Sequence, residues 1–184
     1  MILLGLIALF VFSPAIRGQF LFDDIGVEFF PYRIRAHRLP AYHGWLGDLR
    51  LWHALEGRPL TWWTFQRNFD LAQYSMPAWH LVNYAIHAAN VVLFGNLLHL
   101  MGLAPDRAIL AAAVFAVHPL QVPSVAYVSG RFGILSAFFA LAALNAFVLG
   151  QWWILPLCLY LGMCAKEDIL SVPFLMGALW LTQN

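Results

Sequence analysis

The chain has 184 residues, of which 62% are hydrophobic and only 10% are charged, and its mean hydropathy is +0.72. These values exclude an ordinary soluble globular domain and indicate a polytopic membrane protein. The formal net charge of +1 gives no strongly basic or acidic surface, so no nucleic-acid partner is expected.

Apolar runs along the chain predict about six transmembrane helices, because a helix needs about 20 apolar residues to cross the hydrocarbon layer and lipid offers no hydrogen-bond partners to an open backbone. We therefore expect an all-α fold, a polytopic membrane helical bundle that forms one membrane domain over residues 1–184. The predicted spans are residues 1–16, 79–102, 108–128, 132–150, 152–164 and 169–182. Residues 1–16 could instead be a signal peptide, although no basic segment opens them.

Residues 17–78 are predicted to form a long extramembrane loop, which carries seven of the nine arginines. Its segment 46–55 (LGDLRLWHAL) repeats apolar residues at helical spacing, which predicts a helix lying at the membrane interface. The loop opens with Asp23 and Asp24, in the stretch FLFDDIGVE. Two adjacent carboxylates repel each other and suit a general base or a metal ligand, or they mark the membrane boundary as solvated acids.

The loop ends in residues 58–68 (RPLTWWTFQRN), which interleave aromatic rings with Arg58 and amide groups. Such a surface can stack on sugar rings, or it can lie in the headgroup region, where tryptophan is enriched.

The second predicted span carries polar residues on one face, which are His80, Asn83, His87 and Asn90. Groups of this kind turn away from lipid, towards a bundle interior or a cavity. They could form hydrogen bonds between helices or contact a ligand, and the deeper position of His87 and Asn90 favours hydrogen bonds between helices for that pair.

Two later segments add charges at span boundaries. In HPLQVPSVAYVSGR, two prolines should end the third span at the membrane surface and leave His118 and Arg131 on a polar face. Arg131 could hold a phosphate, or it could extend along the start of the fourth span towards the interface. Lys166, the sole lysine, is followed by Glu167 and Asp168. This segment could be a tight charged turn, or Lys166 could face a phosphate while its two acidic neighbours set its position.

Each crossing reverses sides, so the loops after spans one, three and five must share one face of the membrane. Those three loops hold nearly all the charge, whereas the opposite face receives little beyond Asp106, Arg107 and Gln151. A one-sided polar surface built from three loops predicts a functional site there.

Taken in order, FLFDDIGVE, RPLTWWTFQRN, PAWHLVNYAIHAAN, FAVHPLQVPSVAYVSGR and MCAKEDILSVP resemble motifs of GT-C type integral-membrane glycosyltransferases. The likeness is to the protein O-mannosyltransferase branch that carries tetratricopeptide repeats, and it implies that the chain is the truncated, amino-terminal half of such a membrane domain. The resemblance implies a polyprenyl-phosphate-linked sugar as donor and Asp23 or Asp24 as catalytic base. It also implies that Arg131 and Lys166 bind the donor phosphate. The other polar residues expected to support this site are His80, Asn83, His118, Arg58 and Glu167.

Two positions depart from the family pattern. An acidic residue commonly ends an HPxxxE motif, where this chain has Pro123, and another follows the glycine-arginine pair by two places, where this chain has Gly133. These departures motivate an alternative function, a catalytically inactive structural or lipid-binding subunit of a larger membrane complex.

We thus expect a membrane glycosyltransferase, or half of one, that acts on a hydroxyl acceptor. No cofactor is required, although a divalent metal ion could bind at the aspartates. Expected partners are membrane lipid, the polyprenyl-phosphate sugar and other membrane protein chains. The resemblance implies a bacterial inner membrane or its equivalent with the polar face periplasmic or lumenal, whereas the arginines of the first loop, counted alone, would favour the inside.

Overall fold

The computed structural model describes residues 10–18 and 58–183, and within these ranges the chain is helical and contains no strand. The predicted all-α bundle is confirmed. The predicted interfacial helix at residues 46–55 and both aspartates of the FLFDDIGVE stretch lie outside the described residues, as does most of the first predicted span. The elements are η1 (Ser13–Arg17), α5 (Pro59–Ala72), α6 (Met76–Leu100), α7 (Pro105–Val117), η2 (Pro119–Gln121), α8 (Val122–Ala126), α9 (Arg131–Val148), α10 (Leu155–Ala165), η3 (Glu167–Ser171) and α11 (Val172–Gln183).

Two of the described helices, α6 and α9, are long and apolar enough to cross a membrane. The 25 residues of α6 rise about 38 Å, which exceeds the roughly 30 Å hydrocarbon core. A third crossing results if α7 and residues 119–126, which are bent by 51° relative to each other, count as one span. The structure therefore supports a membrane protein but does not confirm six spans, because α10 and α11 have only 11 and 12 residues.

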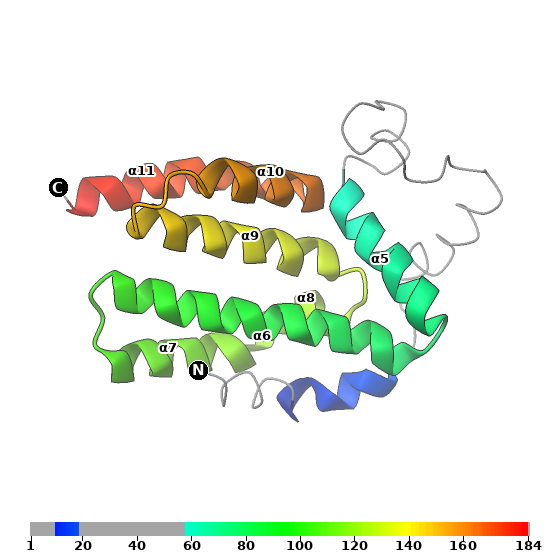
Figure 1. The fold of residues 1–184 in the computed structure, drawn as a ribbon. Coiled ribbons are helices and arrows are strands. Elements are labelled where there is room, and N and C mark those ends of the chain that lie inside the picture. Colours follow the sequence, from blue (N-terminus) through cyan, green and yellow to red (C-terminus); the bar gives the residue numbers. More distant parts are fainter. Residues whose placement is uncertain (1–9, 19–57, 184) are drawn as a thin grey trace.

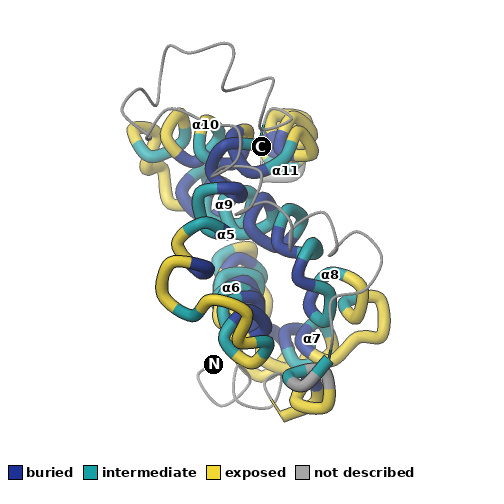
Figure 2. Tube along the Cα trace, turned by 90° about the vertical axis from the view of Figure 1, so that its right-hand side faces the viewer, coloured by how far each residue is buried: buried dark blue, intermediate teal, exposed yellow. Residues whose placement is uncertain are grey.

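The helices stack in layers, with α7 and α8 against α6, α6 against α9, and α9 against α10 and α11 (Figure 1). Buried residues line the inner faces of this stack, and the outer faces of α7, α10 and α11 are largely exposed (Figure 2). Exposed apolar side chains such as Leu110, Phe174 and Leu181 suit contact with lipid. Helix α5 crosses one end of the stack (Figure 1).

That end, called here the polar end, consists of α5, the amino-terminal ends of α6 and α9, and the carboxyl-terminal end of α10. Its elements are joined by Thr61 Oγ1, which donates to Ala165 O over 3.1 Å, and by Arg131 Nη2, which donates to Trp79 O over 3.0 Å. At the opposite end, α6 and α9 stop at turns that contain Gly102 (φ 95°) and Gly150 (φ 70°). A positive φ favours glycine, so these residues fix where the helices end.

The third predicted span, residues 108–128, is broken more deeply than expected. Pro119 offers no backbone N–H and disfavours helical geometry at His118, so α7 ends at Val117. His87 Nε2 lies 3.0 Å from Ala116 O, and His87 is near the midpoint of α6. The break therefore lies halfway along α6, whereas the sequence predicted it at the membrane surface.

Candidate functional site

The polar end gathers most of the described residues that were predicted to form a site. Arg58 precedes α5, His80 and Asn83 lie in the first turns of α6, Arg131 begins α9, and Lys166 and Glu167 follow α10. His118 lies apart from them, at the break halfway along α6, where its Nδ1 accepts a hydrogen bond from Leu120 N over 3.2 Å. Asp23 and Asp24 are outside the described residues.

Arg131 is fully buried, with no exposed surface. Its Nε donates to Asn83 Oδ1 over 2.7 Å, and its Nη2 donates to Asn68 Oδ1 over 2.8 Å and to Trp79 O over 3.0 Å. A longer contact of 3.4 Å joins Nη1 to Thr64 O. These bonds tie α5, α6 and α9 together through one side chain.

Aromatic rings complete the surroundings of the Arg131 guanidinium, which lies 4.7 Å from the ring centre of Phe65 and 5.7 Å from that of Trp79. No carboxylate of the described residues pairs with it; amide and carbonyl oxygens and ring faces stabilise its charge instead. In this arrangement the side chain points into the protein and holds the polar end together. The phosphate contact predicted for Arg131 from the sequence stays a prediction.

The polar face of α6 is also directed into the bundle. Asn83 Nδ2 donates to Tyr127 O over 2.8 Å and Asn90 Nδ2 donates to Ile134 O over 2.9 Å, while His80 Nε2 lies 3.4 Å from Gly18 O. All these side chains are buried. Their partners are backbone carbonyls of neighbouring segments, which is the pattern expected for hydrogen bonds between helices.

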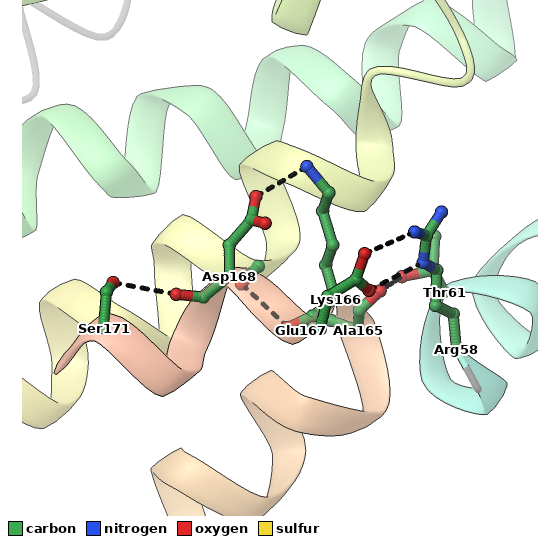
Figure 3. Close-up of polar contacts among 8 residues, drawn as sticks. Arg58, Thr61, Ala165, Lys166, Glu167, Asp168 and Ser171 are labelled. Atoms are coloured by element: carbon green, nitrogen blue, oxygen red, sulfur yellow. Dashed lines mark hydrogen bonds and ion pairs between the residues drawn. The ribbon is translucent and has the colours of Figure 1, made fainter. Parts of the chain in front are cut away.

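The charged turn after α10 is exposed at the polar end, and Figure 3 shows its contacts. Arg58 makes a bidentate pair with Glu167, with Nη2 to Oε1 at 2.7 Å and Nε to Oε2 at 3.1 Å. Lys166 Nζ lies 2.5 Å from Asp168 Oδ2. The side chains of Glu167 and Asp168 are more than half exposed, at 58% and 59%, so solvent or a ligand reaches both pairs.

The electrostatics of this turn follow from those two pairs. The hydrogen bonds from Arg58 hold the pKa of Glu167 below its usual value, and the charge of Lys166 acts in the same direction. Two cations and two carboxylates cancel formally, and exposed ion pairs are weak. An incoming anion such as a phosphate can therefore bind Arg58 and Lys166 if the exposed carboxylates of Glu167 and Asp168 turn away into solvent.

Hydrogen bonds from side-chain hydroxyls to backbone carbonyls fix the position of the turn. Thr61 Oγ1 donates to Ala165 O and Ser136 Oγ donates to Lys166 O over 3.4 Å, which gives partners to carbonyls at the end of α10. Sequence reasoning singled out neither Thr61 nor Ser136, and it missed Asn68 as a partner of Arg131. The 58–68 motif contains Thr61 and Asn68, but no local pattern indicates that they face α9 and α10.

Within the described ranges, no three His, Cys, Asp or Glu side chains gather as a metal site. The divalent metal considered for Asp23 and Asp24 falls outside these ranges and stays a prediction.

Sequence comparison identifies relatives among proteins named protein O-mannosyl-transferases. Mouse protein O-mannosyl-transferase TMTC3 is 40% identical over 86 residues, which cover 47% of this chain and 9% of the relative. Human protein O-mannosyl-transferase TMTC4 is 32% identical over an alignment of 167 residues, which covers 76% of this chain and 22% of the relative. The Caenorhabditis elegans protein O-mannosyl-transferase F38B6.6 is 35% identical over 91 residues, 47% of this chain and 13% of the relative.

The chain thus spans between 9% and 22% of the length of these relatives. No protein-family model matches it, and no solved structure is significantly similar to it.

Proposed function

This chain is related in sequence to protein O-mannosyl-transferases, and from that premise we propose that it works as a membrane glycosyltransferase, or as half of one. The proposed reaction transfers a sugar from a polyprenyl-phosphate donor to a hydroxyl acceptor. The acceptor oxygen forms the new bond to the anomeric carbon, and the bond from that carbon to the phosphate oxygen breaks. The polyprenyl phosphate leaves with the bonding electrons.

Such a reaction needs a base for the acceptor proton and cations for the leaving phosphate. Asp23 or Asp24 is the proposed base. Lys166 is the proposed phosphate contact, with Arg58 beside it, because Lys166 lies on the exposed turn after α10 and Arg58, which precedes α5, pairs with Glu167 of that turn. Arg131 is a positioning residue, since its hydrogen bonds hold α5 against α6 and α9. His80 and Asn83 support this end from the interior, and Glu167 orients Arg58.

The observation that carries the proposal is the gathering of Arg58 and Lys166 at one end of a membrane bundle, although they lie 108 positions apart in the chain. The charges lie where a lipid-borne phosphate would meet the protein, at a membrane boundary. We place this end on the periplasmic or lumenal side of a bacterial inner membrane or its equivalent.

The test is sugar transfer by the purified chain in reconstituted membranes, with a polyprenyl-phosphate sugar and a hydroxyl-bearing peptide. Asp23→Asn or Asp24→Asn should lower the rate at least about 100-fold, because the acceptor keeps its proton. Lys166→Gln should lower the rate by a similar factor, because the negative charge of the leaving phosphate is then not neutralised. Arg67→Gln is the matched control, since Arg67 is an exposed cation of α5 that pairs with Asp70. Equal rates for the wild type and all these variants would refute the assignment.

A second candidate function is a catalytically inactive subunit of a membrane complex. Pro123 and Gly133, which stand where the resembled motifs carry acids, favour it. A subunit should co-migrate with stoichiometric partner chains in mild detergent and transfer no sugar, whereas transfer by the isolated chain would exclude it.

A further inference from the structure

An apolar groove runs along the outer side of α7, on the far side of α6 from α9. Its volume is about 590 Å³, and its walls come from Phe94 of α6, Leu110 and Val114 of α7 and Leu120 of η2. Leu110 is 66% exposed and Val114 is 55% exposed. None of these residues takes part in the site at the polar end.

The groove has the length of one membrane leaflet. It extends from Arg107, in the first turn of α7, to His118 at the break. Eleven residues at helical rise span about 16 Å, and half of a typical hydrocarbon core is about 15 Å. The break lies beside the midpoint of α6, where His87 contacts Ala116 O, so the groove starts at the membrane boundary and ends near the middle of the bilayer.

The boundary end of the groove carries a cation that forms no ion pair within the described residues. The side chain of Arg107 forms no ion pair or hydrogen bond with any residue of the described ranges. Its neighbour Asp106 lies in the first turn of α7, where the helix dipole favours a carboxylate, and it makes no ion pair with Arg107. At the inner end, His118 Nδ1 is engaged by the backbone of Leu120, and Gln121 adds no charge.

We propose that this groove binds an anionic phospholipid, with the phosphate at Arg107 and one acyl chain along α7 as far as the break. The apolar walls of the groove match an acyl chain, and the length of the groove matches one leaflet. The unpaired guanidinium of Arg107 matches a lipid headgroup that carries a net negative charge. The site lies at the end of the bundle opposite Lys166, so it is independent of the proposed sugar transfer.

The experiment measures lipid retained by the whole chain in mild detergent by native mass spectrometry. The probes are phosphatidylglycerol and phosphatidylcholine with identical acyl chains, supplied in equal amounts. The wild type should retain phosphatidylglycerol in preference, by about fivefold, which is the effect of one cation near an anionic lipid. Arg107→Gln should abolish this preference, and Val114→Trp, which fills the groove, should lower retention of both lipids.

Arg67→Gln is the matched control, because it removes an exposed cation from α5 at the other end of the bundle and should leave the preference intact. Far-ultraviolet circular dichroism checks that each variant keeps its helices. The proposal is overturned if Arg107→Gln retains the wild-type preference, or if Arg67→Gln loses as much of it. It is equally overturned if a cross-linker placed at position 114 captures a polypeptide instead of lipid.

Discussion

Arg131 shows how one residue can carry a charge in the interior of a membrane bundle. Burying an unpaired guanidinium is costly, since the charge loses its hydration. Here two asparagine oxygens and the carbonyl of Trp79 accept its hydrogen bonds, and the rings of Phe65 and Trp79 face it. The planar fork of arginine reaches acceptors on several helices at once, which a lysine ammonium cannot do.

Arg131→Lys should therefore destabilise the fold although it keeps the charge. The ammonium cannot satisfy Asn68 Oδ1, Asn83 Oδ1 and Trp79 O together, and unsatisfied buried acceptors cost about 1–3 kcal/mol each. We expect a loss of about 3 kcal/mol in the free energy of unfolding, measured by denaturant titration in detergent with circular dichroism. Arg67→Lys, at an exposed pair, should change this free energy by less than about 0.5 kcal/mol. A similar small change for both variants would show that the interior contacts of Arg131 contribute nothing.

The connection between α8 and α9 depends on a close approach of two backbones. A Cβ added to Gly130 would lie 2.3 Å from Ser124 O, and 2.7 Å from Pro123 O. The φ of Gly130 is −55°, which any residue adopts, so space and not conformation requires glycine here. This contact fixes where α9 begins and hence where Arg131 enters the bundle.

Gly130→Ala should push α8 away from α9 and destabilise the fold by about 1–3 kcal/mol, as overpacking does. Gly133→Ala is the matched control, because Gly133 lies in the first turn of α9 with nothing within 4 Å of the added Cβ. In a helix that exchange should stabilise by about 0.5–1 kcal/mol. Thermal unfolding in detergent measures whether each variant is more or less stable than the wild type. Stabilisation by Gly130→Ala would contradict the close approach of the two backbones.

For the whole molecule, the alternating direction of the helices decides which loops meet. Helices α6 and α9 leave the polar end, and α7 and α10 return towards it (Figure 1). Arg131 after the predicted third span and Lys166 after the fifth therefore both lie at the polar end, as the sequence predicted, whereas His118, predicted for the same polar face, lies at the break halfway along α6. The turns at 101–104 and 149–154 lie at the opposite end.

Single cysteines in sealed vesicles test this arrangement, in a background where Cys158 and Cys164, both buried, are replaced by alanine. Asp168→Cys and Gln151→Cys should react with an impermeant thiol reagent from opposite sides, because the two exposed positions lie at opposite ends of the bundle. Asp24→Cys should react from the side of Asp168→Cys if the first loop shares the polar end. Reaction of the Asp168→Cys and Gln151→Cys variants from one side would overturn the alternating arrangement.

The sequence by itself determined the membrane character, the all-helical fold and two of its long helices, since apolar runs of this length have few alternatives in lipid. The predicted spans 79–102 and 132–150 correspond to α6 (Met76–Leu100) and α9 (Arg131–Val148). The order of the membrane crossings also predicted that Lys166 and Glu167 lie at the end of the bundle where Arg131 lies, because each crossing reverses sides.

Only the tertiary structure decided what the polar side chains contact. Arg58 meets Glu167 across 109 positions, Arg131 turns inward onto Asn68 and Asn83, and the break at Pro119 falls in the middle of the bundle. Hydrophobic periodicity reports which face of a helix is buried, but not which neighbour covers that face or at what depth. Those choices depend on packing between segments that are distant in the chain, so no local pattern encodes them.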